Sequence, residues 1–376
     1  MPEATGAPRM HPTALRLANA PVTSEGAFVT VTAVTGSVRE LVDQRLIAIV
    51  EREMGRLGFL GGQEREAVRR LLARFVIDGG KRLRPSFVFW GHSAAGGSAG
   101  ELDTVLSAGC AVELVHSCAL ILDDIMDESD TRRGRTTAHL ALLDEHRREG
   151  WRGDPRRYGE SVATLLGLLA YTWADTAMVA TGSARAWEVF TQLRVELIGG
   201  QYMDLAHAAR GAGTRSQALL TGAYKSGKYT VEGPLLLGHA LARGLPGVRA
   251  ALSAYALPLG EAFQLRDDVL GVFGDPALTG KPAGADLFLG KQTYLLAEAR
   301  RRTGGHGHTP VDDVRDEADV AAARELIVAC GALEAVERRI DLLTRKATAA
   351  LERAGLPEEA SAALVELARQ VTDRRV

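Results

Sequence analysis

Two aspartate-rich patches, each inside an apolar stretch with helical spacing, are the residues of this chain most suited to chemistry. The first, DDIMD, contains Asp123, Asp124 and Asp127, and the second, DDVLG, contains Asp267 and Asp268. Burying an unpaired carboxylate is costly, so two such clusters in core-like helices require cations. Positions i and i+4 share a helix face, so Asp123 and Asp127 can bind the same ion. Oxygen ligands without cysteine or histidine favour Mg²⁺ that bridges to substrate phosphates.

Basic residues near these patches predict phosphate binding. The segment GGKRLRP contains Gly80, Lys81 and Arg84 at an apparent helix start, where exposed N–H groups and cations can hold a diphosphate. Taken alone, the segment would be interpreted as a solvated basic turn, but its pairing with the aspartates favours a site. Arg132 and Arg133 follow the first motif and can reach phosphate oxygens held by the metals.

Several polar residues lie in apolar helical stretches, which is unusual for surface positions. His116 precedes the first motif by two helical turns, and a core histidine and a ligand are equally good interpretations. Gln201 and Asp204 share one face of an apolar helix. In YKSGKY the sequence predicts a break between two apolar helices, with Lys225 and Ser226 pointing inward.

Two lysines near loops are ambiguous, and two histidines are not. Lys281 in TGKP and Lys291 in GKQT can be site residues or exposed loop charges. His306 and His308 form a glycine-flanked HxH, which we interpret as a loop rather than a metal site.

The elements that must position these residues are helices. Residues 1–35 lack periodicity and predict a flexible tail, and residues 36–376 predict one catalytic domain. Apolar positions at spacings of three and four recur in residues 38–54, 64–77, 102–125, 161–180, 186–206, 235–242 and 250–272, and more weakly in 292–301, 318–330, 333–354 and 357–372. No alternating strands are evident, and longer loops are expected at 93–100, 146–158 and 304–316. The pattern predicts an all-α single-domain bundle with the site in a central cavity.

Composition excludes several classes of protein. The chain has 376 residues, 46% hydrophobic and 24% charged, as in ordinary globular proteins. A net charge of −2 gives no reason to expect nucleic-acid binding. Three scattered cysteines predict neither a disulfide framework nor a zinc site. We see no signal-peptide core and no uninterrupted run long enough to span a bilayer, so we predict a cytoplasmic protein.

Seven motifs occur in the order found in one enzyme family. They are GGKRLRP, ELVHS, DDIMDESDTRRG, GQYMDL, YKSGKY, FQLRDD and GKPAGADL. Over about residues 37–375 the chain resembles a trans-isoprenyl diphosphate synthase of the polyprenyl synthetase family, in particular the actinobacterial geranylgeranyl diphosphate synthases. The resemblance implies the isoprenoid-synthase fold and a homodimer. It also implies condensation of isopentenyl diphosphate with dimethylallyl, geranyl or farnesyl diphosphate, giving all-E geranylgeranyl diphosphate or a longer product.

The resemblance implies a role for each motif residue. The diphosphate of isopentenyl diphosphate would be held by Gly80, Lys81, Arg84, His116 and Arg133. The allylic side would be lined by Arg132, Lys225, Ser226, Gln264 and Lys281, with Gln201 and Asp204 as further substrate-binding candidates. Three Mg²⁺ ions, for which Mn²⁺ can substitute, would be bound by Asp123, Asp127 and Asp267, supported by Asp124 and Asp268.

Product length is predicted from the helix before the first motif. Cys118 and Ala119 lie five and four residues before Asp123, about one turn deeper, and both are small. An open tunnel at this depth favours geranylgeranyl diphosphate or a longer product, with Tyr171 or Trp173 closing it further down. The alternative is that both small residues only pack against another helix.

Three positions depart from the family pattern. Gly271 replaces the usual third aspartate of the second motif, Leu122 replaces a common histidine, and Leu168 replaces a frequent aspartate. We expect Gly271→Asp to remain active if the backbone there is helical, since glycine inside a helix costs about 1 kcal/mol relative to alanine.

Two alternative functions stay open at this point. A terpene cyclase uses the same scaffold but needs no isopentenyl pocket. A non-catalytic subunit of a heteromeric synthase typically loses its aspartates, whereas only the position of Gly271 lacks one here.

Overall fold

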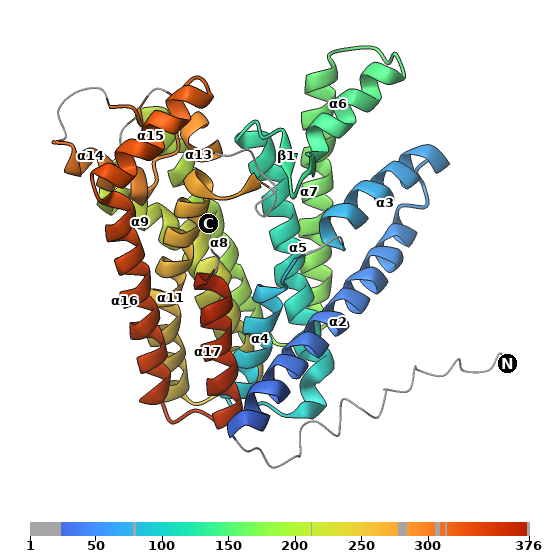
Figure 1. Cartoon of the computed structure of the whole chain (residues 1–376). Helices are drawn as coiled ribbons and strands as arrows, with labels where there is room; N and C mark the ends of the chain where they lie inside the picture. Colours follow the sequence, from blue (N-terminus) through green and yellow to red (C-terminus); the bar gives the residue numbers. More distant parts are fainter. Residues whose placement is uncertain are drawn as a thin grey trace.

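The structure is a computed structural model that describes residues 24–77, 80–211, 213–276, 284–304, 309–312 and 314–373, with side chains from residue 38 onward. Within these ranges the chain forms a bundle of helices with one small β-hairpin (Figure 1). The predicted all-α fold is therefore confirmed.

Short connections join most of the elements along the chain. The first are α2 (Ser24–Arg56), α3 (Gly62–Val76), α4 (Leu83–Ala94), η2 (Ala99–Glu101), α5 (Leu102–Met126), β1 (Thr131–Arg132), β2 (Arg135–Thr136), α6 (Ala138–Arg148) and α7 (Pro155–Val179). The remainder are α8 (Ala184–Arg210), α9 (Arg215–Gly222), η3 (Ala223–Glu232), α10 (Gly233–Leu241), α11 (Pro246–Phe273), α13 (Ala285–Phe288), α14 (Tyr294–Arg302), α15 (Glu317–Ala329), α16 (Ala332–Glu352) and α17 (Glu358–Thr372).

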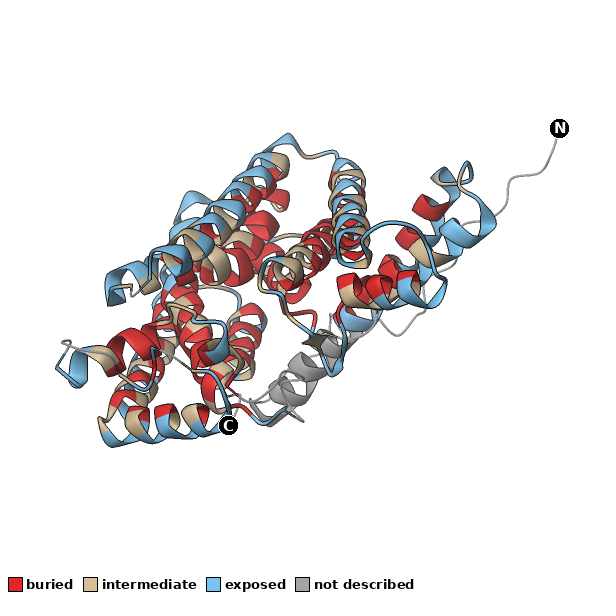
Figure 2. Ribbon diagram, turned by 90° about the horizontal axis from the view of Figure 1, so that it is seen from above, coloured by how far each residue is buried: buried red, intermediate tan, exposed pale blue. Residues whose placement is uncertain are grey.

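Helices α5 and α11, which carry the two aspartate motifs, run through the core. α5 is apolar on nearly all sides and is buried along most of its length, because it packs against α7, α4 and α2. α11 packs against α16, η3 and α17. Figure 2 shows the buried faces of the helices turned toward one another. Both motifs lie near the C-terminal ends of their helices, and β1 and α13, which follow them, lie toward the upper end of the bundle in Figure 1.

Glycines bring three of the helices that flank the motifs into close contact. A Cβ atom at Gly200 of α8 would lie 2.2 Å from the backbone nitrogen of Lys225 in η3. Gly227 of η3 and Gly260 of α11 face each other, and a Cβ atom on either would lie 2.8–2.9 Å from the other's backbone. Only glycine lets backbones approach so closely. These contacts fix the position of Lys225 between α8 and α11.

Three local features differ from the sequence-based expectation. Helix α2 begins at Ser24, so residues 24–35 of the predicted tail are helical. The hairpin and the short amphipathic α6 were not predicted, because both lie in a polar stretch after the first motif. The segment YKSGKY is not a break: η3 is a π-helix that continues directly from α9 into α10. Such π-helical turns occur frequently at functional sites.

Two helical segments have the length and composition of a membrane-spanning helix. They are Ala99–Met126 and Pro155–Val179. The most apolar window of the first is 78% buried by the rest of the protein, as expected for a core helix. The corresponding window of α7 is 44% buried, which leaves an exposed apolar face. Core helices of globular proteins share these properties, so neither segment indicates a membrane span.

The contact at Gly200 can be tested against its neighbour in α8. Gly200→Ala should lower the free energy of unfolding by about 1–3 kcal/mol, because its methyl group would overlap the backbone of Lys225. Gly199→Ala is the matched control, since a Cβ atom at Gly199 meets nothing within 4 Å and alanine favours the helix. Chemical denaturation of both variants measures the difference. Equal stability of the two variants would contradict the close crossing of α8 and η3.

Candidate active site

The first aspartate motif closes the C-terminal end of α5. Asp123 and Asp124 occupy the last turn of the helix, and Asp127 caps it. The hairpin that follows folds back, so that Arg132 donates from Nε to Oδ1 of Asp124 at 2.8 Å and from Nη2 to Oδ2 of Asp123 at 3.2 Å. Asp124 is completely buried, and its pairing with Arg132 holds this guanidinium beside Asp123.

Lys225 of η3 lies directly against the first motif. Its Nζ donates to Oδ1 of Asp123 at 3.0 Å and to Oδ2 of Asp204 at 2.6 Å. Gln201, one turn before Asp204 on α8, donates to the same oxygen of Asp123 at 3.3 Å. Burial alone would lower the pKa of Lys225, but the Asp123 and Asp204 carboxylates outweigh it and raise this pKa, so the ammonium stays charged. Burial likewise opposes ionisation of Asp123, yet Lys225 and other nearby cations hold its pKa below the usual range.

The second motif lies on α11. Asp268 is buried and accepts hydrogen bonds from Nε2 of Gln264 at 2.7 Å and from the backbone N–H of Tyr294 at 3.1 Å. Burial raises the pKa of Asp268 to about 7, although the hydrogen bond from Gln264 opposes this. Asp267 is only half-buried, which leaves it as the carboxylate of this motif more open to a ligand.

Lys291 lies between the first motif and α13. Its Nζ lies 2.7 Å from Oδ2 of Asp127 and 3.9 Å from Oδ1 of Asp286, a residue at the start of α13. The structure thus decides between the two interpretations left open for Lys291, which is not an exposed loop charge. Sequence reasoning missed Asp286, although it lies in the motif GKPAGADL.

A second basic group surrounds the start of α4. Arg84 donates to Oγ1 of Thr230 at 2.9 Å, and its guanidinium lies 4.6 Å from the ring centroid of Tyr229. The rings of His116 and Tyr229 are 6.2 Å apart. Burial lowers the pKa of His116, and the charges of Arg84 and Arg133 lower it further, so the imidazole is neutral. A concentration of guanidinium groups with a neutral histidine suits an anionic ligand.

Arg82 holds the GGKRLRP segment in place. It is buried, and its guanidinium donates to Asp43 and to Glu113, each at 2.7 Å. Its own backbone has a left-handed φ of 49°, as does that of Arg133 with a φ of 53°. A Cβ atom at Gly80 would lie 3.5 Å from Nη2 of Arg133. Arg82 is therefore structural, and it brings Gly80 next to Arg133.

The predicted site residues fall into two adjacent groups. Asp123, Asp124, Asp127, Arg132, Gln201, Asp204 and Lys225 form the group around the first motif. Gln264, Asp267 and Asp268 lie on α11, where Gln264 donates to Asp268. Around the start of α4 lie Gly80, Lys81, Arg84, His116 and Arg133. Ser226 is half-buried on η3. Lys281, His306 and His308 lie outside the described residues.

Two of the three positions that differ from the family pattern lie in very different environments. Leu122 is partly buried and packs beside Gly167, where a Cβ atom would lie 3.4 Å from the leucine side chain. Leu168 is half-exposed on the outer face of α7. The leucine at position 168 therefore leaves no charge missing inside the aspartate cluster.

The carboxylates of the two motifs suit a hard divalent cation whose remaining ligands come from water and from a substrate. Within the described ranges, no three acidic, histidine or cysteine groups are close enough to hold an ion on their own. Mg²⁺ is usually bound by one or two protein carboxylates, with waters and substrate phosphates completing its coordination. Asp123 and Asp127 on one helix and Asp267 on the other offer this type and number of ligands. The ammonium groups of Lys225 and Lys291 beside them mark where positive charge is favourable.

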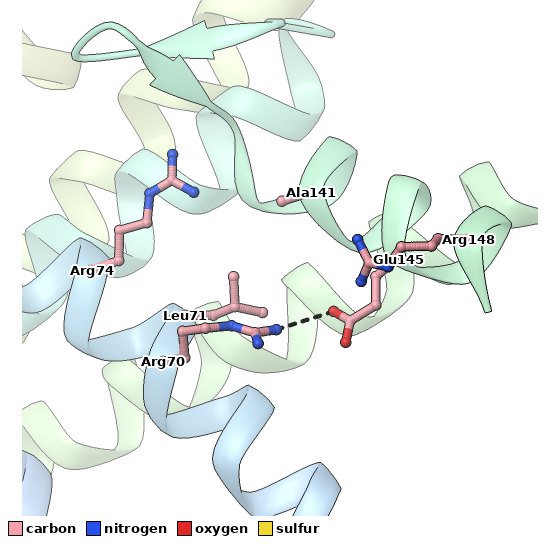
Figure 3. Close-up of a pocket in the computed structure, with 6 residues that line it drawn as sticks. All are labelled: Arg70, Leu71, Arg74, Ala141, Glu145 and Arg148. Carbon is pink, nitrogen blue, oxygen red and sulfur yellow. Dashed lines mark hydrogen bonds and ion pairs between the residues drawn. The ribbon is translucent and has the colours of Figure 1, made fainter.

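A surface groove lies between α3 and α6, and none of its lining residues belongs to the two groups above (Figure 3). It is lined by Arg70, Leu71, Arg74, Ala141, Glu145 and Arg148. Arg70 pairs with Glu145 at 3.2 Å, Arg74 donates to the carbonyl oxygen of Thr136 at 2.6 Å, and Arg148 pairs with Glu149. Arg70 and Arg74 connect neighbouring elements and Arg148 pairs with the residue that follows it, so we assign the groove no ligand.

The fold and the two groups define a class of all-helical enzymes that act on diphosphate esters. The model of the polyprenyl synthetase family matches residues 65–327. The chain therefore belongs to the polyprenyl synthetase family, as the motifs predicted, and is a trans-prenyltransferase.

Individual relatives agree with this assignment. A geranylgeranyl pyrophosphate synthase from Corynebacterium glutamicum, solved with isoprenyl diphosphate and magnesium, is 39% identical with a TM-score of 0.85, covering 90% of this chain and 99% of the other. The short chain isoprenyl diphosphate synthase of Methanothermobacter thermautotrophicus is 29% identical over 276 residues, 72% of this chain and 79% of the relative. The octaprenyl diphosphate synthase of Escherichia coli is 29% identical over 286 residues, 74% of this chain and 81% of the relative.

Proposed function

We propose that this chain joins isopentenyl diphosphate to an allylic diphosphate, head to tail, and releases inorganic diphosphate. The product is all-E geranylgeranyl diphosphate or a longer polyprenyl diphosphate. The observation that supports this proposal is the arrangement of two groups of charged residues, one around the first aspartate motif and one around the start of α4. The hairpin of β1 and β2 contributes an arginine to each. Arg132 faces the aspartates that would hold the allylic diphosphate through metal, whereas Arg133 faces Gly80 and the second basic group.

The chemistry requires positive charge around the leaving group. The bond between the allylic carbon and the diphosphate oxygen breaks, and its electron pair leaves with the diphosphate. The π electrons of the isopentenyl double bond form the new carbon–carbon bond, and a proton is then lost from the adjacent carbon to the departing diphosphate. Mg²⁺, when bound, stabilises the negative charge of the leaving group. Lys225 and Arg132 add fixed positive charge at the same place, and Asp204 and Asp124 keep them oriented.

We propose three Mg²⁺ ions in each site, for which Mn²⁺ substitutes in the assay. Asp123 and Asp127 share one helix face and would hold the ions on the side of α5, and Asp267 would hold an ion on the side of α11. Diphosphate oxygens would complete the coordination of each ion.

The second basic group favours elongation over the two alternative functions. A terpene cyclase binds one diphosphate and has no use for a second cluster such as Arg84, Arg133 and the neutral His116. In a non-catalytic subunit we would expect Asp123 to be replaced, because burial makes an ionised carboxylate costly. Here nearby cations keep Asp123 ionised despite its burial.

The length of the product depends on the space beyond Asp123. On α5 the next turn carries Ala119, partly buried, and Cys118, which is buried. Tyr171 of α7 lies deeper, where the Arg194 guanidinium is 4.9 Å from its ring centroid, and Cys118 is close enough to influence the phenol. We propose that the growing chain passes the small residues and that Tyr171, rather than the core residue Trp173, limits it.

The outer faces of α7 and α8 suit a second copy of the chain. Their exposed large apolar side chains are Leu165, Leu168, Val179, Val195, Ile198, Tyr202 and Leu205. Arg194 of α8 donates to Asp175 of α7, so the two helices are neighbours. Extended apolar surface of this kind is typical of permanent homodimers. We propose a homodimer that buries it.

The three cysteines fit a reducing compartment. Cys110 and Cys118 are buried in α5, Cys330 follows α15, and all three are free thiols. Free cysteines are usual where thiols are kept reduced, so we propose a cytoplasmic location.

The product assay tests the function and the depth of the tunnel together. Wild-type protein incubated with isopentenyl diphosphate and each allylic primer should yield products of geranylgeranyl length or longer. Cys118→Phe should shift the products toward farnesyl diphosphate while the first condensation keeps a similar rate, because the ring fills the turn below Ala119. An unchanged product distribution, or a wild type that stops at farnesyl diphosphate, would contradict this account of the tunnel.

The two diphosphate groups should be separable by steady-state kinetics. Arg84→Ala should mainly raise the KM for isopentenyl diphosphate, since Arg84 would bind it equally in the ground and transition states. Lys225→Ala should mainly lower kcat, by roughly 100-fold, because it removes charge where the leaving group forms. The same kinetic defect in both variants would show that the division of roles is wrong.

The proposed dimer can be tested by sedimentation. Ile198→Glu should convert the protein toward monomer, because it places a charge in the middle of the apolar face of α8. Leu342→Glu on α16 is the matched control, since Leu342 is equally exposed but lies outside α7 and α8. A wild type that sediments as a monomer would refute the proposal.

A further inference from the structure

Position 271 is the feature of the second motif that the family pattern leaves unexplained. Gly271 follows Asp267 by one turn on α11, so a side chain there would lie on the same helix face as the Asp267 carboxylate. The helix is uninterrupted at this point, so glycine is not needed for the backbone conformation. A reason for the glycine must come from its surroundings.

The space beside Gly271 is filled by another carboxylate. A Cβ atom at position 271 would lie 1.9 Å from Oδ2 of Asp286 and 2.4 Å from its Cγ. The Asp286 side chain is only 13% exposed and points at α11 rather than at solvent. Asp286 therefore places a carboxyl group where the side chain of a third motif aspartate would begin.

The local fold holds Asp286 in this position. Gly284, with a φ of 76°, precedes the single turn of α13, and a Cβ atom there would collide with Val320. After α13, the backbone N–H of Lys291 donates to the carbonyl oxygen of Asp286 at 3.0 Å. This turn brings the Lys291 ammonium within 3.9 Å of the Asp286 carboxylate and 2.7 Å of Asp127. Asp286 thus lies against Gly271 of the second motif and beside the lysine that pairs with Asp127 of the first.

We propose that Asp286 supplies the third carboxylate of the second metal-binding motif. Position 271 is a glycine because any side chain there would occupy the space that the Asp286 carboxylate fills. Asp267 of α11 and Asp286 of α13 would then present two carboxylates to the metal ion that binds the diphosphate. This assignment rests on the metal-dependent prenyl transfer proposed above.

The proposal reverses the expectation for Gly271→Asp. A new aspartate would compete with Asp286 for one volume, and in the absence of metal the two like charges would repel each other. The single substitution should therefore impair the protein. Removing the Asp286 carboxylate at the same time should restore function, because one carboxylate then occupies the shared space.

The test uses the full chain and four variants. They are Gly271→Asp, Asp286→Asn, the double variant Gly271→Asp/Asp286→Ala, and Asp144→Asn as a control for charge at an exposed position of α6. Three properties are measured: the melting temperature without metal, the affinity for Mn²⁺ by electron paramagnetic resonance in the presence of inorganic diphosphate, and turnover. The melting temperature and Mn²⁺ affinity do not depend on activity.

Asp286→Asn should weaken Mn²⁺ binding about tenfold or more, the scale typical for groups that support a metal site. Gly271→Asp should lower the metal-free melting temperature. The double variant should recover the melting temperature and bring Mn²⁺ affinity and turnover closer to wild type than either single variant. Asp144→Asn should match wild type in all three measurements.

Two results would overturn the assignment. One is wild-type Mn²⁺ affinity in Asp286→Asn, which would mean that Asp286 only supports the structure. The other is a double variant no better than Gly271→Asp alone. If wild-type protein itself neither binds Mn²⁺ with diphosphate nor turns over, the proposed function fails together with this assignment, so the two failures are distinguishable.

Discussion

The carboxylates at the end of the core helix α5 must be balanced by positive charge, and the arrangement of the residues around them follows from this requirement. Asp123, Asp124 and Asp127 sit on a helix that is otherwise apolar and buried. Lys225, Arg132 and Lys291 come from three other segments to meet them. Ionised groups in such surroundings persist only when they are paired. The same balance of charge would be kept if metal ions and a diphosphate entered the site together.

The fold provides this balance through a few precise contacts. Gly200 lets η3 approach α8 closely enough for Lys225 to reach Asp123. The hairpin after α5 presents Arg132 and Arg133 in opposite roles, one toward the aspartates and the other toward Gly80. In the proposed function one short connection would therefore serve both diphosphates, and a reaction between two diphosphate substrates needs both to be bound side by side.

Sequence alone predicted the long core helices, because their apolar spacing is a local pattern, and it singled out residues of the motifs DDIMD and YKSGKY that the structure brings close together. The apolar periodicity of α5 and α11 identified them as core helices, and the spacing within DDIMD placed Asp123 and Asp127 on one face. What the sequence could not predict depends on distant contacts. The π-helix η3 looked like a break because its glycine faces Gly260, a residue of another helix. The ion pairs of Lys291 and the position of Asp286 likewise depend on α13 folding back over α11.

We infer that the aspartates bind diphosphate only together with metal ions. Isothermal titration calorimetry of inorganic diphosphate, with and without Mg²⁺, on wild type and Asp123→Asn tests it most directly. We expect tight binding to wild type only when Mg²⁺ is present, and a loss of this Mg²⁺-dependent binding in Asp123→Asn, because the variant lacks a charged ligand of the shared ions. Diphosphate binding of equal strength without Mg²⁺, or unchanged Mg²⁺-dependent binding in Asp123→Asn, would contradict the account.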